Sequence, residues 1–147
     1  MRKYIYILIG GALGAAFRLV VENIHIWNYH GNISTNTVII NTVGCFTLAL
    51  FLTVNYEVFE INPDIRLGVA TGLIGAFTTF STFCKETVEL MVGGKYFLAA
   101  SYIVVSSILG FAAIYLGTVL ARKVITVLVR NAKKNDMEIT GNDEENQ

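Results

Sequence analysis

The chain has 147 residues, of which 54% are apolar and 15% are charged, and its 11 Lys and Arg balance 11 Asp and Glu. A typical soluble domain is about 45–50% apolar and about 25% charged, so this composition argues against an ordinary soluble globule. The zero net charge and the two cysteines exclude a basic nucleic-acid-binding surface, a disulfide framework and a four-cysteine metal site.

Long uncharged stretches predict four transmembrane helices. About 20 residues of helix cross a hydrocarbon core about 30 Å thick, and four apolar stretches approach or exceed that length. We place them at about 4–23, 35–55, 66–92 and 96–122. The first stretch also resembles a secretory signal peptide, because Arg2 and Lys3 precede its apolar run, but the three later spans favour a permanent helix.

The first span contains an arginine near its end. Arg18 either extends its side chain to the lipid headgroups or faces an aqueous vestibule, where it attracts anions. Glu22, four residues later, is placed to pair with it. The polar loop at 24–34 contains His25 and His30, and the cores of the second to fourth spans have no His, Asp or Glu. Proton relays, hydrolytic triads and catalytic metals are therefore not expected, which argues against an enzyme.

Polar residues with helical spacing occur in the second and fourth spans. Asn41 lies in the middle of the second span, with Thr37 one turn earlier, and its amide needs partners in hydrocarbon. It either bonds to a neighbouring helix or offers its N–H groups to a passing solute. In the fourth span, Tyr102, Ser106 and Gly110 recur every four residues and share one helix face.

The third span is the least regular. Between Gly72 and Phe83, two glycines are followed by four hydroxyl residues interleaved with three phenylalanines. This composition is compatible with an unbroken helix whose hydroxyls bond to the preceding turn, and with a break whose carbonyls line a cavity or an ion site. We interpret Lys85, Glu86 and Glu89, which follow, as a solvated helix end.

The ends of the chain predict its orientation. Residues 1–123 form the four-helix unit, a basic segment at 124–134 continues the last helix at the headgroups, and the acidic tail at 135–147 is predicted to be disordered. Four spans place both termini on one side, and the positive-inside rule predicts that this side is cytoplasmic, because the opposite loops carry only Lys95. The basic residues on the predicted cytoplasmic side are Arg2, Lys3, Arg66, Arg122, Lys123, Arg130, Lys133 and Lys134.

Three motifs, in order, resemble those of the bacterial fluoride channels, the Fluc or CrcB family, and the match covers about residues 4–122. The motifs run from Gly10 to Arg18 (GGALGAAFR), from Thr37 to Gly44 (TVIINTVG) and from Gly72 to Phe83 (GLIGAFTTFSTF). The resemblance implies an all-α membrane protein with four transmembrane helices per subunit and a broken third helix. It also implies an antiparallel dimer of two inverted subunits, with two pores at their interface.

The resemblance further implies the roles of individual residues. Backbone carbonyls of Gly75 and Thr78, from both subunits, are expected to hold one structural Na⁺ that is not transported. Arg18 is expected near the aqueous vestibule. The residues expected to line the pores are Asn41, Phe80, Thr82, Phe83, Tyr102 and Ser106.

Physical chemistry is consistent with this expectation. Fluoride is small and tightly hydrated, so a pore must replace its water with N–H and O–H donors. Phenyl rings have electropositive edges that contact an anion without a fixed charge, and conduction requires weak successive sites. We therefore expect a passive, fluoride-selective channel in the plasma membrane that lowers cytoplasmic fluoride and protects the cell from it.

Two departures from the family pattern matter. The strong bias of Lys and Arg is unlike the balanced charge of members that insert both ways, so the partner is either a second copy or a sister protein with the opposite orientation. Gly110 also stands at a position of the fourth helix where the family often has a hydroxyl.

Two alternative functions are weaker. A proton-coupled antiporter needs an ionisable group deeper than Glu22. A membrane scaffold leaves Asn41 and the Thr/Ser/Phe run unexplained.

Overall fold

The computed structural model describes residues 1–23, 35–58 and 61–145, and every regular element within these ranges is helical. The first two spans form α1 (Arg2–Asn23) and α2 (Thr35–Glu57). The third span comprises α3 (Pro63–Leu67), the π-helix η1 (Gly68–Ile74), α4 (Gly75–Phe77) and α5 (Phe80–Val92). The last helix is α6 (Tyr96–Glu145). The loop predicted at 24–34, with both histidines, lies outside the described residues.

Four stretches of helix are long and apolar enough to cross a membrane, as the sequence predicts. They are Arg2–Asn23, Thr35–Glu57, Pro63–Val92 and Tyr96–Leu128. Only 11–22% of the residues in their most apolar windows are buried inside the protein. Most apolar side chains therefore face outward, which is stable in lipid and unfavourable in water. The chain is an all-α, multi-pass membrane protein.

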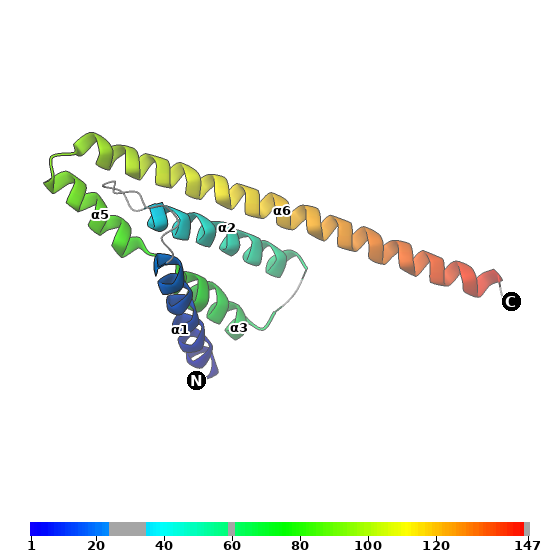
Figure 1. Ribbon diagram of the computed structural model, residues 1–147. Helices are drawn as coiled ribbons and strands as arrows, with labels where there is room; N and C mark the ends of the chain where they lie inside the picture. The colour runs from blue at the N-terminus through cyan, green and yellow to red at the C-terminus, as the bar shows by residue number, and fades with distance from the viewer. Residues whose placement is uncertain (24–34, 59–60, 146–147) are drawn as a thin grey trace.

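The helices pack as two pairs joined by α5 (Figure 1). α1 packs along η1, and α2 packs along α6, with which it runs in the same direction. α5 leads into α6 through a tight turn, in which Gly94 adopts a positive φ of 71° that glycine accommodates without strain. Beside this turn Leu90, Ala99 and Tyr102 form a small buried cluster.

The C-terminal end of α2 contacts α6 through an ion pair and α3 through a cation–π contact. The Nε atom of Arg122 lies 2.9 Å from Oε1 of Glu57. The guanidinium of Arg66 lies over the ring of Tyr56, 4.9 Å from its centroid. Arg66 and Arg122 therefore lie at the same end of the bundle, as the predicted orientation requires.

The last helix extends beyond the fourth span. α6 continues through the basic segment at 124–134 and through 135–145. No proline follows Pro63, so no residue in the tail is sterically excluded from a helix interior. Extending an existing helix is also far less costly than nucleating a new one, which allows α6 to continue beyond its packed part.

The close approach of α1 to the third span depends on Gly14. A Cβ atom there would collide with the carbonyl oxygen of Leu73 and would lie 3.1 Å from the backbone nitrogen of Phe77. Both neighbours are backbone atoms, which cannot rotate away. A Cβ atom at Gly11, on the same helix, would meet nothing within 4 Å. Gly14 therefore sets the distance between the two helices, whereas Gly11 does not.

We predict that Gly14→Ala lowers the stability of the subunit by about 1–3 kcal/mol, the usual cost of overpacking a tight contact. Gly11→Ala, which adds the same methyl group to the same helix, is the matched control and should leave stability nearly unchanged. Thermal unfolding of the two purified variants in detergent measures the difference. Equal melting temperatures would contradict the close-approach interpretation.

Candidate functional site

The third span is interrupted at Thr78 and Thr79. Thr78 (φ −71°, ψ 155°) and Thr79 (φ −139°, ψ 102°) both have extended backbone between α4 and α5. The hydroxyl oxygen of Thr79 accepts a hydrogen bond from the backbone N–H of Thr82 at 3.2 Å, which caps the start of α5. The third span thus consists of helical segments joined by extended backbone, as the broken-helix interpretation predicts.

The side chain of Asn41 holds this interruption in place. The N–H of Thr79 donates to Oδ1 of Asn41 at 2.8 Å, and Nδ2 of Asn41 donates to the carbonyl of Thr79 at 3.0 Å. Thr79 is only 3% exposed, so its backbone groups need such partners. Of the two roles that the sequence leaves open for Asn41, this pairing matches the bond to a neighbouring span, and the contact with a passing solute stays a prediction. The amide has two N–H donors, and this pairing uses one of them.

The break changes the hydrogen bonds of the backbone N–H groups that would bond to the carbonyls of Gly75 and Thr78 in a regular helix. In a regular helix, the N–H of Thr79 would bond to the carbonyl of Gly75, and that of Thr82 to the carbonyl of Thr78. Here they donate to the side chains of Asn41 and Thr79 instead. The Gly75 carbonyl accepts only the Thr78 hydroxyl, at 3.2 Å, among the contacts of the described residues. The two carbonyls that the family resemblance singles out are therefore those the break releases.

Glu86 is not a solvated residue, and this corrects the interpretation from the sequence. Its Oε1 accepts from the hydroxyl of Thr37 at 2.8 Å, and its Oε2 accepts from the hydroxyl of Tyr102 at 2.6 Å. It therefore joins α2, α5 and α6. The signal in the sequence is its position three residues after Phe83, which places the two side chains on one face of α5. Lys85, on the exposed face, pairs with Glu89 as expected.

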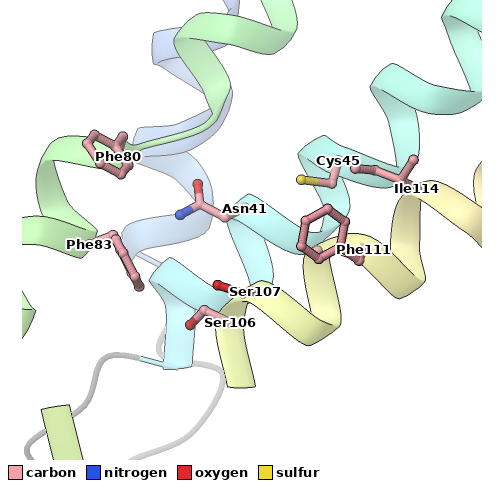
Figure 2. Close-up of a pocket in the computed structure, with 9 residues that line it drawn as sticks. Asn41, Cys45, Phe80, Phe83, Ser106, Ser107, Phe111 and Ile114 are labelled. Carbon is pink, nitrogen blue, oxygen red and sulfur yellow. The ribbon is translucent and has the colours of Figure 1, made fainter. Parts of the chain in front are cut away.

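An open hollow of about 290 Å³ lies between α2, α5 and α6 (Figure 2). It brings together four of the predicted pore residues from three helices, and none of its lining residues carries a formal charge at neutral pH. Phe80 is 78% exposed. The lining residues are Asn41, Cys45, Phe80, Phe83, Ser106, Ser107, Gly110, Phe111 and Ile114.

The other predicted site residues lie outside the lining of this hollow. The buried ring of Tyr102 packs 5.0 Å from that of Phe83, and the hydroxyl of Thr82 lies 2.7 Å from that of Thr79. Arg18 pairs with Glu22 at 3.8 Å, as the sequence predicts, and its side chain is 30% exposed. Its expected place at a vestibule stays a prediction.

The chemistry of the hollow suits a small anion. Phe80 and Phe83 supply ring edges, and their centroids are 6.1 Å apart. Asn41 retains a second N–H donor beyond the one that it gives to Thr79. The Oγ of Ser106 is buried and has no hydrogen-bond partner in the described part of the chain. A buried hydroxyl is costly to leave unpaired, so an acceptor bound in the hollow would be stabilised by it.

Comparison with known proteins gives the family. Residues 5–118 match the family model described as CrcB-like protein, Camphor Resistance (CrcB). A relative in Thermosipho melanesiensis, named fluoride-specific ion channel FluC, is 43% identical over 82% of this chain and 96% of its own length. FluC 1 of Moorella thermoacetica is 39% identical over 81% of this chain and 85% of its own length. FluC 2 of Listeria monocytogenes is 34% identical over 83% of this chain and 92% of its own length.

We predict that Asn41→Leu loosens the break, because it leaves the buried N–H and C=O groups of Thr79 without partners. Each unpaired group costs about 1–3 kcal/mol. Amide hydrogen exchange at residues 79–82 should accelerate about tenfold or more. Thr47→Val, on the same helix, is the control, because the Thr47 hydroxyl bonds only to the carbonyl of Val43. Unchanged exchange in Asn41→Leu would show that the amide does not hold the break.

Proposed function

We propose that this chain, which belongs to the CrcB family, is a fluoride-selective passive ion channel that lowers cytoplasmic fluoride and protects against its toxicity. The family consists of ion channels, so the chain is not an enzyme, and in bacteria such a protein resides in the plasma membrane. The observation that carries the proposal is the uncharged hollow beside the helix break, where Asn41, Phe80, Phe83 and Ser106 meet.

The selectivity for fluoride follows from replacing its water. The amide of Asn41 and the hydroxyl of Ser106 supply donors, and the ring edges of Phe80 and Phe83 supply weak positive potential. A formal positive charge would bind the ion too tightly to release it, whereas successive weak contacts allow conduction. A narrow path of this kind admits a small anion and excludes chloride. Arg18, near the end of its span, would draw anions toward the entrance.

The proposal includes a second subunit in the inverted orientation. The hollow is open, and Phe80 is 78% exposed although it borders the polar break. Lipid cannot satisfy the donors of Asn41 or Ser106, because hydrocarbon offers no hydrogen-bonding groups. A second protein surface that closes the hollow would turn it into an enclosed pore, and twofold symmetry would produce two such pores.

We propose that the released carbonyls of Gly75 and Thr78, with those of the partner, hold a structural Na⁺. Gly75 is exposed in the single subunit, and a Cβ atom there would approach only the carbonyl of Ala70, at 3.7 Å. This leaves room for the partner's backbone to approach. Unwound backbone carbonyls are typical Na⁺ ligands in membrane proteins. The ion would supply positive charge that holds the two breaks together.

The partner is a second copy or a sister protein, and the charge distribution favours the sister. Arg66 and Arg122 lie at one end of the bundle, together with most of the basic residues of the sequence. A chain with this bias inserts in one orientation, so an inverted partner must have the opposite bias. Some relatives carry the names FluC 1 and FluC 2, consistent with paired members.

Thr82 and Tyr102 would extend the polar path beyond the hollow. The hydroxyl of Tyr102 bonds to Glu86, and its ring packs against Phe83. Glu86 therefore acts as a positioning residue, because it fixes the ring that supports Phe83. Two hydroxyl groups, from Thr37 and Tyr102, donate hydrogen bonds to its carboxylate. Their dipoles offset part of its negative potential, which limits its repulsion of an anion.

We expect proteoliposomes loaded with potassium fluoride to release fluoride when they contain this chain, alone or with a sister subunit, because the enclosed hollow offers fluoride a dehydrated path. Liposomes loaded with potassium chloride should retain it. A fluoride or chloride electrode and a potassium ionophore measure the two effluxes. Fluoride retained in both preparations would reject the proposal, and activity only with the sister would identify the heterodimer.

Replacing both Phe80 and Phe83 with Ile should abolish fluoride efflux, because the aliphatic side chains keep the bulk and lose the electropositive ring edges. The control is Phe97→Ile, since Phe97 is 84% exposed at the start of α6 and lies outside the hollow. Assembly is checked by size-exclusion chromatography. A doubly substituted, correctly assembled protein with undiminished efflux would contradict the role of the rings.

A further inference from the structure

Two rows of side chains face each other in register across α2 and α6. Thr37, Asn41 and Cys45 follow one another every four residues on α2, and Tyr102, Ser106 and Gly110 do the same on α6. The helices run in the same direction (Figure 1). The rows therefore form three successive levels, spaced about 6 Å apart by the rise of a helix.

Contacts at each level support this register. Thr37 and Tyr102 meet on the same carboxylate, that of Glu86. At the second level, Asn41 and Ser106 both line the hollow. At the third level, a Cβ atom on Gly110 would lie 3.7 Å from the sulfur of Cys45, and both residues line the hollow. The rows thus meet at the first and third levels and line the same hollow at the second.

The third level differs in kind from the other two. α6 supplies hydroxyls from Tyr102 and Ser106 and only a hydrogen atom from Gly110. The α2 side of this level carries the thiol of Cys45, which is free and partly exposed. Beyond it, Phe111 and Ile114 make the lining apolar. The thiol is therefore the last polar group of the hollow on this side.

A second observation concerns the hydroxyl of Ser106. The Oγ of Ser106 is buried without a hydrogen-bond partner in the described residues, although it lines the same hollow, one level from Cys45. A buried hydroxyl left unpaired costs stability, unless an ion or water occupies the hollow. The thiol thus lies one level from a buried hydroxyl that has no protein partner among the described residues.

Building on the proposed channel, we propose that Cys45 is a pore residue whose S–H group replaces the hydroxyl missing at Gly110. The S–H group is a weak donor, which suits a transient contact with fluoride. A thiol in the ion path is also a binding site for a soft cation such as Hg²⁺. Hg²⁺ binds the sulfur as the thiol proton leaves to water, without oxidation or reduction, and the bound metal obstructs the pore.

The test compares fluoride efflux from proteoliposomes with and without mercuric nitrate, on the protein assembled as it conducts. Mercury should block efflux, and excess dithiothreitol should restore it. Cys45→Ala should resist the block and conduct about twofold less, the factor that a weak hydrogen bond contributes. The control is Cys84→Ala, which changes the other free cysteine, on α5 outside the lining, and should stay sensitive to mercury.

A double variant tests the substitution of thiol for hydroxyl directly. Cys45→Ala with Gly110→Ser returns a hydroxyl to the third level from the opposite helix, where a Cβ atom meets only ordinary contact. It should recover efflux relative to Cys45→Ala and remain resistant to mercury. Recovery with Gly110→Ser but not with Gly110→Ala distinguishes a polar contact from packing, because the two side chains differ only by the hydroxyl.

The outcomes separate this inference from the proposed function. A protein that conducts fluoride but is insensitive to mercury, or whose block persists in Cys45→Ala, contradicts the inference alone. The same holds if Cys45→Ala conducts fully. A protein that conducts no fluoride, alone or with a sister subunit, contradicts the proposed function and this inference with it. The mercury response of the unsubstituted protein needs no variant to fold.

Discussion

The structure depends on the need to satisfy backbone polar groups where no water is present. A broken helix in hydrocarbon exposes N–H and C=O groups, each costly to leave unpaired. Here the amide of Asn41 bonds to both groups of Thr79, and the hydroxyl of Thr79 caps the next helix segment. These side chains replace the backbone partners that the break removes. The carbonyls of Gly75 and Thr78 thereby lose the N–H donors of a regular helix, and the Gly75 carbonyl accepts the hydroxyl of Thr78 instead.

The same constraint bears on the proposed pairing of two subunits. The helices pack in two pairs with most of their apolar surface facing outward, and the hollow beside the break stays open. Lipid can cover the apolar surface but not the donors of Asn41 and Ser106. In the proposed dimer, each four-helix subunit would gain an enclosed pore by pairing, without enlarging its own core.

The lining of the hollow carries no formal charge. Glu86 lies outside the lining, and hydroxyls from Thr37 and Tyr102 bond to its two oxygens. Arg18 pairs with Glu22 near the end of α1. The lining relies on dipoles and ring edges, which bind an anion weakly enough to release it. The thiol of Cys45 extends this series of weak contacts by one step.

The sequence by itself determined the four spans, the all-α class and the family, because each follows from local composition or short motifs. Composition left the third helix either broken or unbroken, and only the family resemblance implied the break. The sequence also indicated that Asn41 needs a partner. Only the tertiary structure decided that this partner is the backbone of Thr79, that Glu86 is enclosed, and that Cys45 faces Gly110. These depend on the register between helices far apart in the chain, which packing sets and no local pattern encodes.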